Sequence, residues 1–469
     1  MIFDNLEKIK NKLYFAVIIG SGPAGISTAL KLEQRGYETL IIESGSLNYN
    51  SENEKFLDGE VIGDDYNDLK TSRLRQFGGT SEIWGGNCSI LKDSDLDDWP
   101  IDKIDLDKYR NEAIKILNIR NDLYHKKFSE NLDYFNIEWS NVKFKEKYFK
   151  YIKKSKKISL SLNTTFCNLE GENGNVKNII CFKKNFFKIN SKNVILSCGG
   201  IENSRLLLIC QKKNNSLFKH QLPIGKYYMD HPKHDVGKGI IVYKKFKNYL
   251  KKKNISNFPT LECKNISLSL NKNFQSLENI LNSGIQLKLK RASPNSNLIR
   301  QANCVAPRFI QNIYSSLMSK DVYEFNLSII QEQFAYKNNR IELSSKLDPL
   351  GFPLPIVYWK KTPLLKKSAL KMMNEFSDIL IAEDLGRLSL NNNILNEESY
   401  KLTLGYHQLG GTRMGNKIEN SVVDENLLVH GFKNLYVNGS STFRTGGFVF
   451  PTFTIVQLAT RLADHITKT

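Results

Sequence analysis

The first strong hydrophobic pattern along the chain is an uninterrupted apolar run at residues 15–19. It leads directly into the glycine-rich turn GSGPAG at residues 20–25, after which apolar residues recur with helical spacing. A second continuous apolar run occupies residues 39–42. Continuous runs of this length are typical of strands buried on both faces of a parallel sheet. The pattern therefore predicts a strand, a helix and a second parallel strand joined by a right-handed connection.

The next part of the chain mixes helical and strand patterns. A helix is predicted at residues 107–117, a small cluster of strands at 158–169 and 176–189, and a strand, glycine turn and helix at 193–208. The last of these repeats the order of the first unit, so it is expected to return to the same kind of sheet.

A different pattern occupies roughly residues 235–401. Alternating strands are predicted at 238–243 and 325–332, and a helix at 364–381, without any glycine-rich phosphate-binding turn. This segment is interpreted as a substrate-covering domain inserted before the sheet is completed by a strand at residues 435–439.

The 469 residues suffice for two or three domains, and 41% hydrophobic residues fit a globular protein. No run approaches the roughly 18 apolar residues of a membrane-spanning helix. Asp4 and Glu7 do not fit the basic start of a secretory signal, so a cytoplasmic location is expected. The cysteines are odd in number and form no C-x-x-C pair, which favours reduced thiols over disulfides or a zinc site. They are Cys88, Cys167, Cys181, Cys198, Cys210, Cys263 and Cys304.

The chain is basic, with 67 Lys and Arg against 48 Asp and Glu and a formal charge of +19. The excess is concentrated in lysine-rich stretches at residues 143–157, 183–192 and 244–253. Such charge fits either an acidic partner or solvated lysine faces. Because no nucleic-acid-binding motif accompanies it, solvated faces are the preferred interpretation and no nucleic acid partner is expected. Polyanion binding stays a secondary hypothesis.

The GSGPAG turn has glycine at the three positions where a dinucleotide-binding turn needs it. Gly20 permits the tight turn, Gly22 lets the backbone approach a pyrophosphate, and Gly25 allows close packing of the helix on the strand. An acid, Glu43, ends the second strand, 18 residues after Gly25. A carboxylate there accepts hydrogen bonds from ribose hydroxyls and would repel a 2′-phosphate. FAD or NAD is therefore predicted, the alternative being a turn without a ligand.

Two glycine-rich turns near the C-terminus point to a reaction centre. The first, at residues 406–415, carries His407, and the second, at residues 445–452, carries Phe450 and enters a helix predicted to start at Pro451. A neutral imidazole is well suited to accept a proton near neutral pH. The start of a helix presents unpaired N–H groups to its surroundings. His407 is accordingly a candidate base, the alternative being a buried structural histidine.

A further glycine-rich run, FGGTSEIWGGN at residues 77–87, would pass for an ordinary loop in isolation. Together with the turns already described and the strings VILSCGGIENS at residues 194–204 and NLYVNGSS at residues 434–441, it resembles the glucose-methanol-choline (GMC) oxidoreductases. These are flavoenzymes that bind FAD and oxidise alcohols. The nearest subgroup is the bacterial sugar- or polyol-oxidising branch that includes pyranose oxidase. Residues 235–401 match the family only in their placement.

The resemblance implies an α/β fold made of two parts. An FAD-binding Rossmann-like domain with a parallel sheet takes residues 1–100, 155–234 and 402–469, and an α+β substrate-binding domain with an antiparallel sheet takes residues 101–154 and 235–401. The resemblance implies no metal. It places FAD contacts at Gly20, Gly22, Gly25, Glu43, Gly78, Gly79, Thr80, Trp84, Asn87, Phe166, Gly199, Asn438, Gly439 and Thr452.

The resemblance also implies a reaction. His407 matches the family histidine that accepts a hydroxyl proton while a hydride passes from the same carbon to flavin N5. The start of the last helix, at Thr452, would stabilise the negative charge that results. The implied substrate is a sugar-like or polyol molecule, and the electron acceptor is left open.

Two positions depart from the family pattern. Ile83 stands where relatives with covalently bound flavin have a histidine, so non-covalent FAD is expected. Phe450 stands where the family has a second catalytic histidine or asparagine, and it can donate no hydrogen bond from its side chain. Of the other histidines, His231 is expected to be structural, and His430 and His465 are expected at the surface.

Three functions therefore stay open. The leading one is an FAD-dependent dehydrogenase or oxidase of CH–OH groups in which another group replaces the usual partner of His407. The second is a flavoenzyme on the same fold whose reaction is not alcohol oxidation. The third is a non-catalytic flavin-bearing or polyanion-binding protein.

Overall fold

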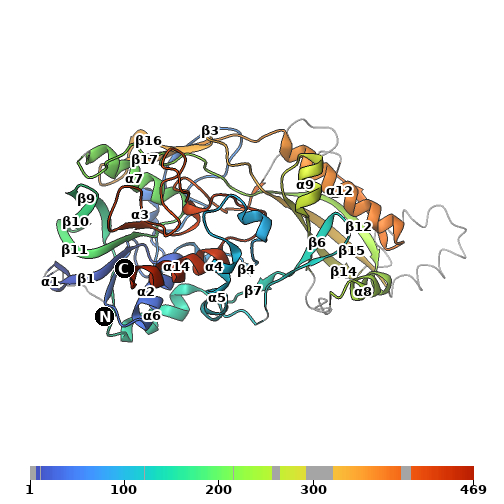
Figure 1. Cartoon of the computed structure of the whole chain (residues 1–469), viewed down its shortest axis with the longest axis horizontal. Coiled ribbons are helices and arrows are strands. Elements are labelled where there is room, and N and C mark those ends of the chain that lie inside the picture. The colour runs from blue at the N-terminus through green and yellow to red at the C-terminus, as the bar shows by residue number, and fades with distance from the viewer. Residues whose placement is uncertain are drawn as a thin grey trace, which may run out of the picture.

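The fold has two large sheets toward opposite ends of the long axis of the molecule (Figure 1). Cys263 and Cys304 lie outside the described residues. The computed structural model describes residues 7–10, 12–120, 122–214, 216–255, 265–291, 321–391 and 403–468.

The first sheet has seven strands, with the order β8-β2-β1-β11-β10-β9 and β20 paired with β11. Strands β8, β2, β1, β11 and β20 pair in parallel, as the sequence predicts for the first unit and for the strand near the C-terminus. The strand at the start of the predicted local cluster, β8, is instead an edge of this parallel sheet. The bounds are β1 Leu13–Ile19, β2 Thr39–Ile42, β8 Ile158–Ser161, β9 Thr165–Glu172, β10 Asn175–Lys183, β11 Asn185–Leu196 and β20 Leu435–Val437.

The twelve-residue strand β11 belongs to two different environments, and its sequence reflects both. Its first half forms an antiparallel hairpin with β10, where buried and exposed side chains alternate. Its last three residues lie between β1 and β20 and are all buried. Alternation of buried and exposed side chains is typical of a half-exposed antiparallel strand. A continuous apolar run is typical of a parallel strand that is covered on both faces.

Helices cover this sheet and complete its core. The C-terminal helix α14 packs against α2, α4 and α5, and nearly all of its faces are buried. Such all-round burial is expected of a helix enclosed between other layers. The bounds are α1 Glu7–Lys10, α2 Pro23–Gln34, α4 Lys103–Asp107, α5 Arg110–Leu117, α6 Phe144–Lys154, α7 Gly200–Lys213 and α14 Thr452–Ile466.

The second sheet is antiparallel and has eight strands, with the order β18-β12-β15-β14-β13-β6-β5 and β19 paired with β12. The predicted strands and antiparallel pairing in this part of the chain are thereby confirmed. The bounds are β5 His125–Lys127, β6 Leu132–Phe135, β12 Pro232–Val242, β13 Asn265–Leu270, β14 Ser283–Arg291, β15 Val322–Gln331, β18 Gly386–Leu390 and β19 Thr403–Leu404.

Helix α12, Leu364–Ala382, lies along this second sheet (Figure 1). Its buried residues Leu365, Ala369, Met372, Phe376 and Leu380 recur every three or four positions, so they form one stripe facing the sheet. The other helices of this part are α8 Tyr243–Lys252 and α9 Lys272–Glu278.

Two small sheets and several short helices connect the large sheets. The three-stranded sheet has the order β16-β17-β3, and β4 pairs with β7. The residue limits of the two domains stay a prediction. The bounds are β3 Glu60–Gly63, β4 Asn87–Cys88, β7 Glu138–Trp139, β16 Arg340–Leu347, β17 Pro353–Trp359, α3 Ser51–Glu54, η1 Lys55–Leu57, η2 Gly79–Glu82, η3 Asp93–Leu96 and η4 Ser440–Thr442.

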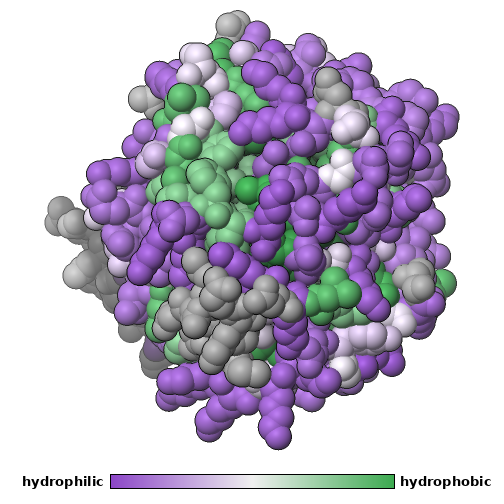
Figure 2. Space-filling view, turned by 90° about the vertical axis from the view of Figure 1, so that its left-hand side faces the viewer, coloured by the Kyte–Doolittle hydropathy of each residue, from purple (hydrophilic) through white to green (hydrophobic). Residues whose placement is uncertain are grey.

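The surface of the parallel-sheet end is largely hydrophilic, with apolar surface in smaller patches (Figure 2). Several lysines here pair with acids, as Lys188 does with Glu170 and Lys177 with Glu172. Among the helices that the structure describes, none is both long and apolar enough to cross a membrane.

Candidate functional site

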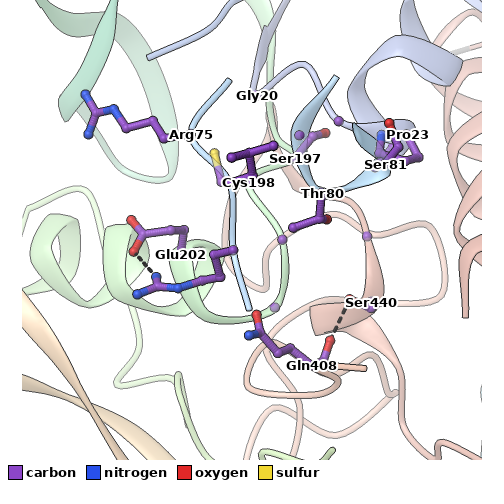
Figure 3. Close-up of a pocket in the computed structure, with 18 of the residues that line it drawn as sticks. Gly20, Pro23, Arg75, Thr80, Ser81, Ser197, Cys198, Glu202, Gln408 and Ser440 are labelled. Carbon is purple, nitrogen blue, oxygen red and sulfur yellow. Dashed lines mark hydrogen bonds and ion pairs between the residues drawn. The ribbon is translucent and has the colours of Figure 1, made fainter. Parts of the chain in front are cut away.

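A cavity of about 610 Å³ opens where strands β1 and β11 end. This volume is in the usual range for small-molecule sites, and the carboxyl ends of parallel strands are where such sites form. Figure 3 shows the cavity walls coming from the first turn, the second glycine-rich run, α7 and the C-terminal segment. The predicted site residues on the walls are Gly20, Gly22, Glu43, Gly79, Thr80, Trp84, Asn87, Phe166, Gly199, His407, Gly439, Phe450 and Thr452.

The first turn requires glycine for different reasons at two positions. Gly20 has a φ of +102°, and a Cβ there would lie 2.6 Å from the carbonyl oxygen of Ser197. A Cβ on Gly25 would lie 2.0 Å from the carbonyl oxygen of Gly20, so Gly25 lies behind the wall and lets α2 pack on the turn. Gly22 faces open space, with nothing within 4 Å of its Cβ position.

Glu43 lies at the end of β2 with its carboxylate held on the cavity wall. One oxygen accepts hydrogen bonds from the backbone N–H and the hydroxyl of Ser21, at 3.0 and 2.6 Å. The other oxygen accepts from the backbone N–H of Gly45 at 2.7 Å. An ionised carboxylate has about four acceptor positions, so it can also accept a hydrogen bond from a ligand hydroxyl.

The second glycine-rich run packs directly on the first turn. The backbone N–H of Gly78 donates to the carbonyl of Ser21 at 3.2 Å, and a Cβ on Gly79 would lie 3.1 Å from the Cα of Gly22. Gly78 has a φ of +95° and lies behind the wall, while Gly79 lines the cavity. The two runs therefore form one continuous surface.

Asn438 also lies behind the wall. Its side-chain amide donates to the hydroxyl of Thr28 at 3.0 Å, and its carbonyl accepts from the amide of Asn203 at 3.1 Å. Asn438 thus holds β20, α2 and α7 together. Gly439, with a φ of +116°, then turns the chain onto the cavity wall.

Three helices begin at the cavity. Their N-cap residues, Gly22 for α2, Gly199 for α7 and Pro451 for α14, all line it, and none provides a side-chain cap. Helix α14 begins at Thr452, one residue later than predicted. Uncapped N-termini leave N–H groups unpaired and carry partial positive charge, so they stabilise anions. The cavity therefore suits a ligand with several anionic groups, as a dinucleotide has.

His407 lines the cavity from the turn after β19, and its Nδ1 is 2.8 Å from Nδ1 of His231. The two rings are nearly perpendicular, at 88°. Burial, and then the neighbouring His231 and Lys233, lower the pKa of His407 well below its usual value. His407 is therefore neutral at neutral pH. Within the described part of the chain, its Nε2 makes no hydrogen bond.

Asp230 holds both histidines through their backbone. One carboxylate oxygen accepts from the N–H of His231 at 2.7 Å and from the N–H of His407 at 2.9 Å. The other accepts from the hydroxyl of Tyr66 at 2.8 Å. Burial raises the pKa of Asp230 to about 6 despite these hydrogen bonds. Asp230 is thus a buried anchor for the His407 turn.

Phe450 contacts His407 through its ring. The ring centroids are 5.5 Å apart and the planes meet at 81°. The backbone N–H of Phe450 donates to the hydroxyl of Ser89 at 3.1 Å. The ring packs against the imidazole without fixing which of its nitrogens carries a proton.

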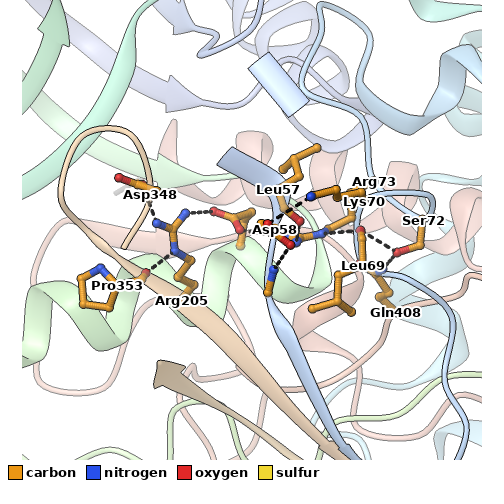
Figure 4. Close-up of polar contacts among 12 residues, drawn as sticks. Leu57, Asp58, Leu69, Lys70, Ser72, Arg73, Arg205, Asp348, Pro353 and Gln408 are labelled. Atoms are coloured by element: carbon orange, nitrogen blue, oxygen red, sulfur yellow. Dashed lines mark hydrogen bonds and ion pairs between the residues drawn. The ribbon is translucent and has the colours of Figure 1, made fainter. Parts of the chain in front are cut away.

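Charged side chains form a second part of the wall. Glu202 of α7 accepts from Arg73 at 2.7 Å and from Arg205 at 3.1 Å, and Arg205 also donates to Asp348 at 2.6 Å and to the carbonyl of Pro353 at 2.7 Å (Figure 4). All four charged side chains are buried or nearly so. The network ties α7 to the segment before the second glycine-rich run and to the turn between β16 and β17.

Several charged or titratable wall or near-wall residues were not predicted as part of the site, and three of them lie near His407 or on α7. They are His231, Lys233 and Glu202. His231 lies just before β12 and Lys233 lies on it, both about 175 residues from His407, so no local spacing indicates their proximity. His430 and His465, expected at the surface, are half-buried, and His430 Nε2 is 2.8 Å from the hydroxyl of Ser421.

The fold and the cavity together define a class of protein, in which a parallel-sheet part with a glycine-rich turn of the dinucleotide-binding type is joined to an antiparallel-sheet part, with a candidate base on the cavity wall. Residues 335–459 match the model of the GMC oxidoreductase family. Formate oxidase from Aspergillus oryzae has a TM-score of 0.60 at 14% identity, covering 98% of this chain and 99% of the other. Pyridoxine 4-oxidase from Mesorbium loti has the same TM-score and identity, covering 97% and 99%. At this identity the likeness concerns the fold.

Two curated proteins are similar in sequence. The large subunit of fructose dehydrogenase from Gluconobacter japonicus is 34% identical over 28% of this chain and 22% of its own length. The 2-methyl-1,2-propanediol dehydrogenase of Mycolicibacterium austroafricanum is 25% identical over 60% of this chain and 49% of its own. The chain thus matches less than half of the length of either relative. The chain is thus similar to GMC oxidoreductases over part of its sequence, and its fold is like that of the two oxidases.

Proposed function

We propose that the protein is an FAD-dependent oxidoreductase that oxidises a CH–OH group of a sugar-like or polyol substrate to a carbonyl, with His407 as the general base. The observation that carries the proposal is that a neutral histidine lines the same cavity as three helix N-termini and the GSGPAG turn. A base and an anion-binding wall thereby meet at one site.

The cavity residues fit FAD. Gly22 and Gly199 have open space at their Cβ positions, which lets a ligand approach the backbone closely. The helix N-termini behind them favour the pyrophosphate, and Glu43 favours the ribose hydroxyls. Ile83 offers only hydrocarbon at the position that forms the histidine link in covalent relatives. We therefore propose non-covalent FAD.

Oxidation of an alcohol removes a proton from oxygen and a hydride from carbon. Bound FAD would supply the hydride acceptor, and the chain must supply the base. Nε2 of His407 is the ring nitrogen without a hydrogen bond among the described residues, so it can accept the hydroxyl proton. The N-terminus of α14 at Thr452 is placed on the same wall and favours negative charge in the cavity.

The substrate class rests on the motifs and on the names of relatives. Fructose and 2-methyl-1,2-propanediol, which name the two curated relatives, both carry more than one hydroxyl group. A sugar-like or polyol substrate, as in the pyranose oxidase-like branch, is the proposal these names support. Formate oxidase shows that the same fold also serves a donor that is not an alcohol. The test therefore includes a donor that is not an alcohol, because Phe450 provides no side-chain hydrogen-bond donor beside His407.

The test is anaerobic reduction of the purified yellow protein by a panel of sugars, polyols, sterols, aromatic alcohols and formate. We expect sugars or polyols to bleach the flavin absorbance, and oxygen or a quinone to restore it. Bleaching by formate alone would replace the proposal with the non-alcohol reaction. Protein that contains no flavin after purification, and takes up none, would indicate a non-catalytic role. Acid precipitation then distinguishes covalent from non-covalent FAD, since non-covalent FAD stays in the supernatant.

The role of His407 is tested by His407→Ala. Loss of a general base lowers the rate by roughly 10²- to 10⁴-fold. We expect this loss in the rate of flavin bleaching with FAD content unchanged. His430→Ala is the matched control, because His430 does not line the cavity and should keep the wild-type rate. An unchanged rate in His407→Ala would overturn the assignment.

A further inference from the structure

We propose that Arg75 binds the adenosine half of FAD with its planar guanidinium group. The inference rests on the proposed function for the identity of the cofactor. Arg75 is not among the predicted FAD contacts, although it lines the same cavity as Glu43 and Phe166.

Arg75 is a buried cation that lacks an ion pair. The other two arginines of the wall, Arg73 and Arg205, both pair with Glu202. Only 9% of Arg75 is exposed, yet its side chain forms no ion pair among the described residues, and Glu54 accepts a hydrogen bond only from its backbone N–H, at 3.3 Å. Its Nε is buried and has no hydrogen-bond partner among the described residues. Because an unpaired buried charge is costly, such an arginine on a cavity wall indicates a bound ligand.

The guanidinium is held in place from several sides. The ring of Phe56 lies against one of its faces, with the guanidinium carbon 3.7 Å from the ring centroid. Nη2 donates to the hydroxyl of Thr165 at 2.6 Å. The backbone is fixed as well, since a Cβ on Gly45 would lie 2.2 Å from the carbonyl oxygen of Arg75. Phe56 does not line the cavity and Arg75 does, so the cavity meets the guanidinium on the side away from Phe56.

These contacts place the guanidinium at the ribose end of the site. Gly45, on which Arg75 packs, donates its backbone N–H to the carboxylate of Glu43 at 2.7 Å. The residue before Thr165 donates its N–H to the carbonyl of Glu43 at 2.9 Å. Figure 3 shows Arg75 and Pro23, the first residue of α2, on opposite sides of the site. The pyrophosphate belongs at the start of α2 and the ribose at Glu43, which leaves the adenosine half for Arg75.

Adenosine has the chemistry that this guanidinium needs. A guanidinium stacks on aromatic faces and donates several N–H groups in its own plane. Adenine offers an aromatic face and ring-nitrogen acceptors, and the ribose adds hydroxyl oxygens. One guanidinium that is already stacked on Phe56 can therefore hold the nucleoside by stacking, by hydrogen bonds or by both.

The test is the release of FAD from diluted holoenzyme, followed by the rise in flavin fluorescence. We expect the Kd of FAD to rise about 10- to 100-fold in Arg75→Met, the range for loss of a hydrogen bond to a charged group, with the absorption spectrum of the bound flavin unchanged. Arg75→Lys keeps the charge but not the planar group, so we expect a rise of at least about tenfold. Arg340→Met is the matched control and should keep the wild-type Kd, because Arg340 stacks on Tyr358 at 3.8 Å but does not line the cavity.

Three results would overturn the proposal. An unchanged Kd in Arg75→Met would show that no contact with FAD exists. A wild-type Kd in Arg75→Lys would indicate a phosphate, which needs only a point charge, and an altered flavin spectrum would place the contact at the isoalloxazine. If Arg75→Met does not fold, a crystal structure of the FAD-loaded wild-type protein decides. We expect the guanidinium within about 4.5 Å of the adenosine, and contact with only the pyrophosphate or the isoalloxazine would refute this.

A purely structural role for Arg75 predicts a different pattern. Phe56→Leu removes the stack, and we expect it to raise the Kd of FAD in the wild-type background but not in Arg75→Met, because Phe56 acts through Arg75. Equal effects in both backgrounds would contradict the proposal. None of these measurements needs a substrate, so their failure is distinct from a failure of the alcohol panel, whereas protein without flavin would overturn both proposals.

Discussion

Lys233 lies on the cavity wall, and its positive charge is one of the causes that lower the pKa of His407. We expect Lys233→Met to raise that pKa, because removal of a nearby cation favours the protonated imidazole. Since a base must be neutral to act, the acidic limb of kcat/KM should move to higher pH. The rate of flavin bleaching as a function of pH measures this shift of the acidic limb. Lys238→Met, at an exposed position of the same strand, is the control and should leave the limb in place.

At the scale of elements, the Glu202 network determines how α7 is attached to its neighbours. Burial acts to raise the pKa of Glu202, but Arg205 and Arg73 outweigh it, so the pKa is lowered and the side chain is ionised at neutral pH. Its removal leaves two buried guanidinium groups without their shared carboxylate, although Arg205 keeps Asp348. Breaking a buried ion pair on one side is far more costly than losing an exposed one.

We expect Glu202→Gln to lower the free energy of unfolding by about 3 kcal/mol, which is typical of an uncompensated buried charge. Urea unfolding of the FAD-loaded protein measures the change. Glu170→Gln is the matched control, because the ion pair of Glu170 with Lys188 leaves 40% and 57% of the two side chains exposed. Exposed pairs contribute less than about 1 kcal/mol. Similar losses in both variants would contradict the role given to Glu202.

The elements that could be predicted from sequence are those whose pattern is local. The unit β1–α2–β2 combines two apolar runs with a glycine turn, and α12 has a single buried stripe, so both follow from periodicity. Strand β8 was assigned to a local cluster because its neighbours along the chain form a hairpin. Its pairing with β2 depends on chain segments more than 100 residues apart, which periodicity does not report.

At the scale of the whole molecule, the wall residues that belong to local sequence motifs were predictable. The wall residues that are brought together only by contacts between distant chain segments were not. The glycine turns place Gly22, Gly79 and Gly199 on one wall, as their motifs indicate. His231 reaches His407 only because β12 and the turn after β19 lie together, and its own surroundings in sequence resemble an ordinary structural loop. His407 was thus identifiable from sequence as a candidate, whereas its contact with His231 was not.

The junction between the two large sheets contains a pair of acids, the half-buried Glu332 and the buried Asp95. Glu332 follows β15 and accepts a hydrogen bond from the backbone N–H of Gly447 at 3.2 Å. Asp95 accepts from the side chain of Asn282 and from the backbone of Lys92, both at 2.9 Å. Burial, and then the charge of Asp95, raise the pKa of Glu332 to about 7. The junction therefore favours a protonated Glu332.

This raised pKa makes the stability of the whole molecule depend on pH. Below the ordinary pKa of a glutamate, about 4.3, Glu332 is protonated in both the folded and the unfolded chain. As the pH rises to about 7, the unfolded chain ionises first, so the stability that the protonated form provides is lost.

Glu332→Gln stays neutral and keeps an oxygen for the N–H of Gly447. We expect it to match the wild-type free energy of unfolding near pH 4 and to exceed it by about 4 kcal/mol above pH 7, on the order of 1.4 kcal/mol per unit of pKa. Urea unfolding across this range measures the difference, with Glu130→Gln as the control at an exposed acid. A difference that does not change with pH would show that folding does not shift the pKa of Glu332, and would contradict this assignment.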